Sequence, residues 1–143
     1  RRKNKMADAV TSQTLADGDK IAVIKITNIS DGTGEASVKK VDVSALNANS
    51  NGDACTRVSI NQVWYDIGGL RTALEFDASS NVVGLVLGGS AAAGTTMGYM
   101  DFRSFSGIKN NAGSGITGDI DLTTHGHTAH DHYTIILELS KSY

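Results

Sequence analysis

The stretch Tyr-Thr-Ile-Ile-Leu-Glu-Leu-Ser, residues 133–140, decides the fold class. Large apolar side chains recur at every second position, which places four of them on one side of an extended strand: Tyr133, Ile135, Leu137 and Leu139. The positions between them are mostly polar, as in a strand that packs only one face on a core. The stretch therefore predicts a half-buried β-strand.

Other segments of the chain share this period of two. It places Leu70, Thr72, Leu74 and Phe76 in one row, and Val58, Ile60, Gln62 and Trp64 in another. The run 20–29 is rich in β-branched residues but alternates less strictly, as expected of a strand buried on both faces. We predict eight or nine strands, at about 9–15, 20–29, 36–43, 57–66, 70–77, 81–88, 97–105, 116–123 and 132–140. A short helix is expected only within 43–48.

The connections between these strands are rich in Gly, Asn and Asp. The chain has 16 glycines and no proline, so its tight turns depend on residues that tolerate positive φ. Many short strands separated by such turns are typical of an antiparallel sandwich. We therefore predict an all-β fold, an antiparallel, jelly-roll-like β-sandwich.

Length and charge indicate one domain with a basic leader. A chain of 143 residues can bury one continuous core. Arg1, Arg2, Lys3 and Lys5 make residues 1–8 a basic, flexible arm, and 9–143 is the expected sandwich domain. Acidic residues outnumber basic ones in the remainder, which argues against sequence-specific nucleic-acid binding. No apolar run is long enough to span a membrane as a helix.

All four histidines of the chain lie within one segment, His125, His127, His130 and His132. It resembles the HxHxDH motif of metallo-β-lactamase-fold hydrolases, but Ala129 occupies the position of the motif's aspartate. We therefore expect no catalytic metal centre. A polar loop between the last two strands is the favoured interpretation, and a metal ion shared between subunits is the alternative.

No other motif predicts catalysis or a cofactor. The sequence lacks nucleophile and phosphate-binding motifs, and Cys55, the one cysteine, is expected to pack as a small apolar residue. Asp119 and Asp121 share one face of a strand and are expected to be solvated. One aromatic set suits either a sugar platform or, as we favour, core and interface packing: Trp64, Tyr65, Tyr99, Phe102 and Phe105.

Several blocks of the sequence resemble small virion structural proteins of tailed bacteriophages, especially phages of marine bacteria and cyanobacteria. They are 17–19, 26–35, 41–46, 99–103 and 133–143, so the resemblance extends from about Met6 to the C-terminus. It implies a structural role in the virion, assembled in the host cytoplasm. Two segments depart from the pattern, 90–96 and the histidine-rich segment.

Within the virion, the leading hypothesis is a capsid decoration, or cement, protein that binds and stabilises the mature head. We expect a homo-oligomer, as a trimer, with the major capsid protein or another virion protein as partner. A neck, tail or fibre-attachment component is the alternative, and a carbohydrate-binding module is the alternative of a different class. Tyr99, Arg103 and Tyr143 are the expected interface residues, because aromatic and Arg side chains anchor interfaces.

Overall fold

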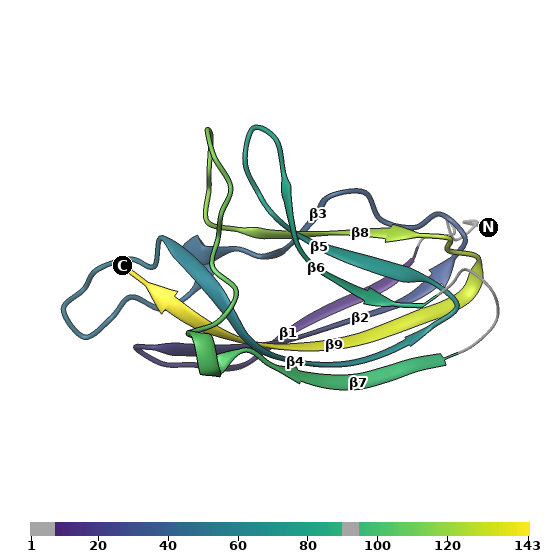
Figure 1. Ribbon diagram of the computed structural model, residues 1–143, viewed down its shortest axis with the longest axis horizontal. Coiled ribbons are helices and arrows are strands. Elements are labelled where there is room, and N and C mark those ends of the chain that lie inside the picture. The colour runs from purple at the N-terminus through teal and green to yellow at the C-terminus, as the bar shows by residue number, and fades with distance from the viewer. Residues whose placement is uncertain (1–7, 90–94) are drawn as a thin grey trace, which may run out of the picture.

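Two antiparallel β-sheets lie face to face in the computed structural model, which describes residues 8–89 and 95–143 (Figure 1). The five-stranded sheet has the order β1-β2-β9-β4-β7, and the four-stranded sheet has the order β3-β8-β5-β6. The strands are β1 (Ala9–Asp17), β2 (Ile21–Asp31), β3 (Val38–Val41), β4 (Arg57–Gly68), β5 (Arg71–Phe76), β6 (Val82–Gly88), β7 (Thr95–Asp101), β8 (Ile120–His125) and β9 (Ala129–Ser142). The prediction of an all-β sandwich is confirmed.

The strand order is that of a jelly roll with one additional edge strand. Without β1, the sheets read β2-β9-β4-β7 and β3-β8-β5-β6, so the chain crosses between the two layers repeatedly. This is the double-sheet arrangement of eight strands that defines a jelly roll. β1 extends the larger sheet beyond β2.

The core lies between the sheets and is centred on β9. This strand of 14 residues pairs with β2 on one side and β4 on the other. The predicted row Tyr133, Ile135, Leu137 and Leu139 is fully buried, as expected from its alternation. Thr72, Leu74 and Phe76 of β5 are buried in the same core, and so is Cys55.

The row predicted on β4 is interrupted after Ile60, because the strand contains a β-bulge there. The pairing with β9 shifts between Ile60 and Gln62, so one residue is inserted and the alternation changes phase. Val58, Ile60, Val63 and Ile67 are buried, whereas Trp64 is exposed. Trp64 therefore lies on the outer face of the sheet, and its expected place in the same row as Val58 and Ile60 was wrong.

Three other local expectations also need correction. β2 alternates strictly, with Ile24 and Ile26 buried and Ile29 exposed, so it is not buried on both faces. The expected helix within 43–48 is a single 3₁₀ turn, η1 (Val43–Ala45), which Asp42 caps through its side chain. A second 3₁₀ turn, η2 (Arg103–Phe105), ends the segment expected to be one strand over 97–105.

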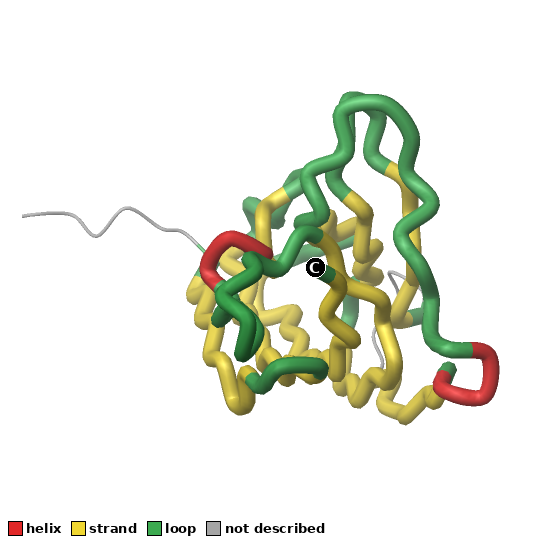
Figure 2. The backbone as a smooth tube through the Cα atoms, turned by 90° about the vertical axis from the view of Figure 1, so that its left-hand side faces the viewer, coloured by secondary structure: helices red, strands yellow, loops and turns green. Residues whose placement is uncertain are grey.

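Two loops rise together on the side of the four-stranded sheet, as Figures 1 and 2 show. One joins β5 to β6, and the other joins η2 to β8. Ser79 N–H donates to Ser114 O over 3.0 Å, and Thr117 N–H donates to Asp77 O over 3.2 Å. These backbone hydrogen bonds hold the two loops against each other.

The described part of the chain begins at Asp8, within the segment expected to be a basic arm. Residues 1–7 of the expected basic arm lie outside the described part of the chain, and β1 begins at Ala9. Asp8 contacts the domain, because its carboxylate accepts hydrogen bonds from the Asn28 side chain and from Asp31 N–H. Among the described residues, no helix has the length and apolar character needed to cross a membrane.

Candidate functional site

Six side chains form a continuous patch on the outer face of the five-stranded sheet, and we call this patch the Trp64 cleft. On β4, Trp64 lies between Tyr99 of β7 and Ile136 of β9. In the adjacent row, Asp66 lies between Met97 and Thr134. Paired residues in a sheet present their side chains on the same face, so the two rows adjoin.

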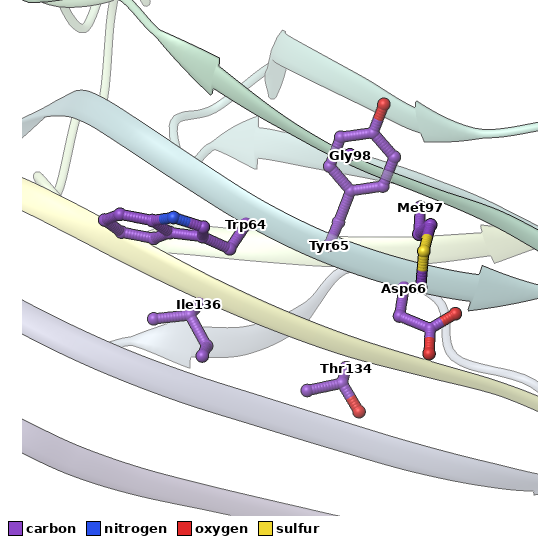
Figure 3. A pocket seen from close by; sticks show the side chains of 7 residues that line it. All are labelled: Trp64, Tyr65, Asp66, Met97, Gly98, Thr134 and Ile136. Atoms are coloured by element: carbon purple, nitrogen blue, oxygen red, sulfur yellow. The ribbon is translucent and has the colours of Figure 1, made fainter.

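The patch is hollowed into a cleft of about 470 Å³ between these rows. Figure 3 shows Trp64 and Ile136 at one end of it, and Asp66, Met97 and Thr134 at the other. Tyr65 contributes to the lining but points away from this group. Gly98 of β7 adds only backbone to the lining, because it has no side chain.

The apolar side chains of the cleft are unusually exposed for their size. The exposed fraction is 38% for Trp64, 48% for Tyr99 and 70% for Met97. The two aromatic rings stack with centroids 5.3 Å apart and planes inclined by 30°. Single exposed apolar residues are common, whereas a contiguous apolar patch on a rigid sheet is typical of a binding surface.

Hydrogen bonds fix the aromatic end of the cleft. Tyr99 Oη donates to Gln62 Oε1, and Gln62 Nε2 donates to Glu138 Oε2 over 2.7 Å. The chain of bonds spans β7, β4 and β9 and sets the position of Tyr99 beside Trp64. The aromatic pair is therefore held in place before any partner binds.

Beyond this end, Arg103 forms a two-pronged ion pair with Asp101. Its Nε and Nη2 each donate to one carboxylate oxygen of Asp101 over 2.9 Å. The hydrogen bonds from Arg103 lower the pKa of Asp101 to about 2. Both side chains are largely exposed, so this pair shapes the rim of the surface and adds little stability.

Asp66 supplies the one carboxylate among the described side chains that line the cleft. Its Oδ1 is buried and accepts no hydrogen bond from the described residues. The carboxylate also forms no salt bridge within residues 8–89 and 95–143. Its cross-strand neighbours are Met97 and Thr134, with Trp64 and Ile136 in the adjacent row, and a carboxylate in these mainly apolar surroundings favours a donor or a cation beside it.

The histidine-rich segment is more ordered than expected. β8 extends to His125 and β9 begins at Ala129, so the loop between them is shorter than the predicted one. The His127 ring packs on Gly34, and the His132 ring packs on Gly68. A Cβ would lie 2.3 Å from the His127 ring at Gly34 and 2.4 Å from the His132 ring at Gly68, so a larger residue at either place would require the ring to move.

These contacts direct two of the histidines to different parts of the sandwich. Within the described ranges, no three His, Cys, Asp or Glu side chains gather closely enough to hold a metal ion. His130 is exposed and adopts φ of 74°. The metal site shared between subunits remains a prediction, since it depends on a second chain.

A second polar cluster lies inside the sandwich, around Glu35. Its carboxylate accepts hydrogen bonds from Tyr133 Oη over 2.5 Å and from Asn28 Nδ2 over 2.7 Å, and it pairs with Lys40 Nζ. All four residues are buried. Burial and the neighbouring carboxylate raise the pKa of Tyr133 above its usual range. The cluster therefore joins the two sheets, and Asn28 Oδ1 is its one buried side-chain oxygen without a hydrogen-bond partner among the described residues.

Asp119 and Asp121 are buried, so the expectation of a solvated pair was wrong. Asp119 accepts a hydrogen bond from Val43 N–H over 2.9 Å and pairs with Lys39. Asp121 accepts one from Asn81 Nδ2 over 3.2 Å. Burial, with Asp77 and Glu75 nearby, raises the pKa of Asp121 to about 6. The loops over this end of the sheet cover both residues, which the local alternation did not reveal.

The three residues expected at an interface do not form one surface. Tyr99 belongs to the Trp64 cleft, and Arg103 lies just beyond its rim. Tyr143 follows the end of β9, where its Oη donates to Asp19 O and its ring lies 5.6 Å from Lys141 Nζ. Asp66, Met97 and Ile136 were not predicted as members of a surface site. The sequence signal that could have marked this face is the set of residues that alternate with the buried ones on β4 and β9.

Comparisons of this chain with protein-family models, curated proteins and solved structures gave no match.

Proposed function

We propose that this protein is a structural component of a tailed-bacteriophage particle, a decoration or cement protein on the outside of the mature head. It acts by binding and carries out no catalytic step. It binds as a homo-oligomer, with a trimer expected, and the major capsid protein is its partner. A position at the neck, tail or fibre attachment is the alternative within the particle.

The Trp64 cleft is the observation that carries this proposal. Trp64, Tyr99 and Met97 are large, exposed and mounted on paired strands, so a partner can cover them without any rearrangement of the sheet. Burying a large apolar side chain is worth about 1.5–3 kcal/mol, and aromatic residues dominate the energetics of most interfaces. The resemblance of several sequence blocks to virion proteins supports the same function.

A small contact surface on each subunit is sufficient for binding when several subunits of one oligomer bind the same head. When one subunit of an oligomer binds the head, the remaining subunits bind from a high local concentration, which raises avidity by about 10²–10⁴. Each bound copy then favours the assembled head by mass action. Decorated heads are therefore expected to resist heat and internal pressure better than undecorated ones.

The experiment mixes the purified protein with undecorated mature heads and measures co-sedimentation and the temperature of DNA release. We expect saturable binding at many copies per head and a higher release temperature. Trp64→Ala is expected to abolish binding, and Val83→Ala, at an exposed position on the other sheet, serves as the matched control. Binding restricted to the neck or tail supports the alternative position, and absence of any binding to particles refutes a virion role.

A carbohydrate-binding module is the second candidate, and the stacked Trp64–Tyr99 pair favours it. The face of a pyranose ring packs on aromatic side chains, and Thr134 and Asp66 offer hydrogen-bonding groups beside them. A glycan array read at physiological salt tests this function. Binding to one glycan class that Trp64→Ala removes supports the module, whereas an array without signal leaves the virion role.

A further inference from the structure

The cleft combines an exposed aromatic ring with an unpaired carboxylate on one strand face. Trp64 and Asp66 are two residues apart on β4, and such residues on one face of a strand lie about 7 Å apart. The Asp66 carboxylate has hydrogen-bonding capacity that the described chain leaves unused. A group that stacks on the indole and also donates hydrogen bonds to Asp66 would use both features at once.

The charge of the cleft indicates which chemical group would bind there. The cleft contains a carboxylate and no described basic side chain within pairing distance of it. A cation is attracted both to the carboxylate and to the negative face of an indole ring. A neutral sugar would gain from stacking and from hydrogen bonds to Thr134 and Asp66, but it would bring no charge to pair with the carboxylate.

Geometry favours guanidinium over ammonium. The guanidinium group of arginine is planar, stacks on aromatic rings and donates up to five hydrogen bonds in a fixed plane. It is also less strongly hydrated than the ammonium of lysine, so its transfer into a cleft lined by Ile136 and Met97 costs less. The methylene stem of the same side chain would pack against these two residues.

We infer that the Trp64 cleft binds an arginine side chain of the partner protein, with the guanidinium stacked on Trp64 and hydrogen-bonded to Asp66. This inference depends on the proposed function only in taking the partner to be a protein. It identifies the partner's contact residue by its chemistry.

Trp64 is the only tryptophan of the chain, so its fluorescence reports directly on the cleft. The experiment titrates the intact protein with the peptide acetyl-Leu-Arg-Leu-amide and with the same peptide carrying citrulline or lysine. Citrulline keeps the shape of arginine but has no charge. We expect the arginine peptide to change the fluorescence at concentrations at least about tenfold lower than the citrulline peptide, with the lysine peptide between them.

Two variants assign the effect to Asp66. Asp66→Asn is expected to weaken the response to the arginine peptide by at least about tenfold without altering the unfolding transition. Asp53→Asn removes an exposed carboxylate outside the cleft and is expected to bind like the parent protein. Equal responses to the arginine and citrulline peptides, or a response to neutral saccharides alone, would overturn the inference.

Binding to heads separates this inference from the proposed function. If heads bind the parent protein and Asp66→Asn equally well, but not Trp64→Ala, the virion role holds and the arginine contact is refuted. If heads bind none of them while the arginine peptide still requires Asp66, the arginine site holds and the virion role is refuted.

Discussion

Two carboxylates of this protein lie among apolar side chains, Glu35 between the sheets and Asp66 on the outer face of one sheet. Glu35 accepts hydrogen bonds from Tyr133 and Asn28 and pairs with Lys40, so its charge is compensated inside the chain. Asp66 has one buried oxygen with no hydrogen-bond partner in the described chain. The Glu35 carboxylate stabilises the fold, whereas the Asp66 carboxylate can still accept hydrogen bonds from a partner.

This difference in internal pairing helps to distinguish polar residues that stabilise the fold from polar residues that can bind a partner. A buried charge that costs desolvation persists in a stable fold when it is paired and hydrogen-bonded. A carboxylate left without such compensation lowers the stability of the free protein, and a partner that supplies the missing donors recovers that loss on binding. Four predictions test this contrast.

The largest effect is expected from Glu35→Leu. Removing the carboxylate leaves the Lys40 ammonium buried without its counter-charge, and such a loss typically costs about 3–5 kcal/mol. Urea unfolding followed by circular dichroism measures this change. The double variant Glu35→Leu, Lys40→Met is expected to recover most of the loss, and a single variant as stable as the parent would contradict a structural role for this pair.

Tyr133→Phe is expected to cost about 2 kcal/mol, because the Glu35 carboxylate loses one charged hydrogen bond while keeping its two other partners. The ring stays in the core, so the same unfolding measurement isolates the hydroxyl group. Tyr65→Phe, for which no side-chain hydrogen bond is found in the described residues, is the control and should leave stability nearly unchanged. Equal losses for both variants would show that the Glu35 cluster contributes no specific stability.

Asp121 gives a smaller, pH-dependent effect. Its folded pKa of about 6 exceeds the ordinary aspartate value of 3.8, so the folded state binds a proton more tightly than the unfolded state does. Its contribution to stability therefore grows as pH falls through 6, by about 1 kcal/mol between pH 7 and pH 5. Unfolding of the parent and of Asp121→Asn at both pH values measures the difference, and identical pH dependence in the two proteins would contradict this assignment.

The smallest effect is expected from Asp66→Val. An apolar, β-branched residue suits this strand position and removes a carboxylate that lacks partners in the described chain, so stability should stay unchanged or rise by up to about 1 kcal/mol. The same urea measurement, run beside Glu35→Leu, compares the two carboxylates directly. A loss of more than about 1 kcal/mol would mean that Asp66 also serves the fold.

The sequence predicted the sandwich because its information is local and periodic. The rows on β5 and β9 alternate without interruption, and the glycine-rich turns punctuate them, so the strands could be placed within a few residues. The bulge between Ile60 and Gln62 has no comparable local signal. It reverses the faces of the second half of β4 and so decides that Trp64 points outward.

The candidate site was only partly predictable for the same reason. Tyr99 was predicted to be an interface residue from its type alone, whereas Asp66, Met97 and Ile136 join it through strand pairing between distant parts of the chain. The buried state of Asp119 and Asp121 depends in turn on loops that cross their sheet. Pairing register and loop placement are tertiary properties, and a single sequence does not determine them by periodicity.

Cryo-electron microscopy of heads saturated with the protein tests the central claim most directly, namely that the Trp64 cleft is the surface that meets the particle. We predict that the outer face of β9, β4 and β7 lies against the capsid, with partner density over Trp64 and a side chain reaching Asp66. The account would be contradicted by bound protein in which this face is directed toward solvent and another surface makes the contact.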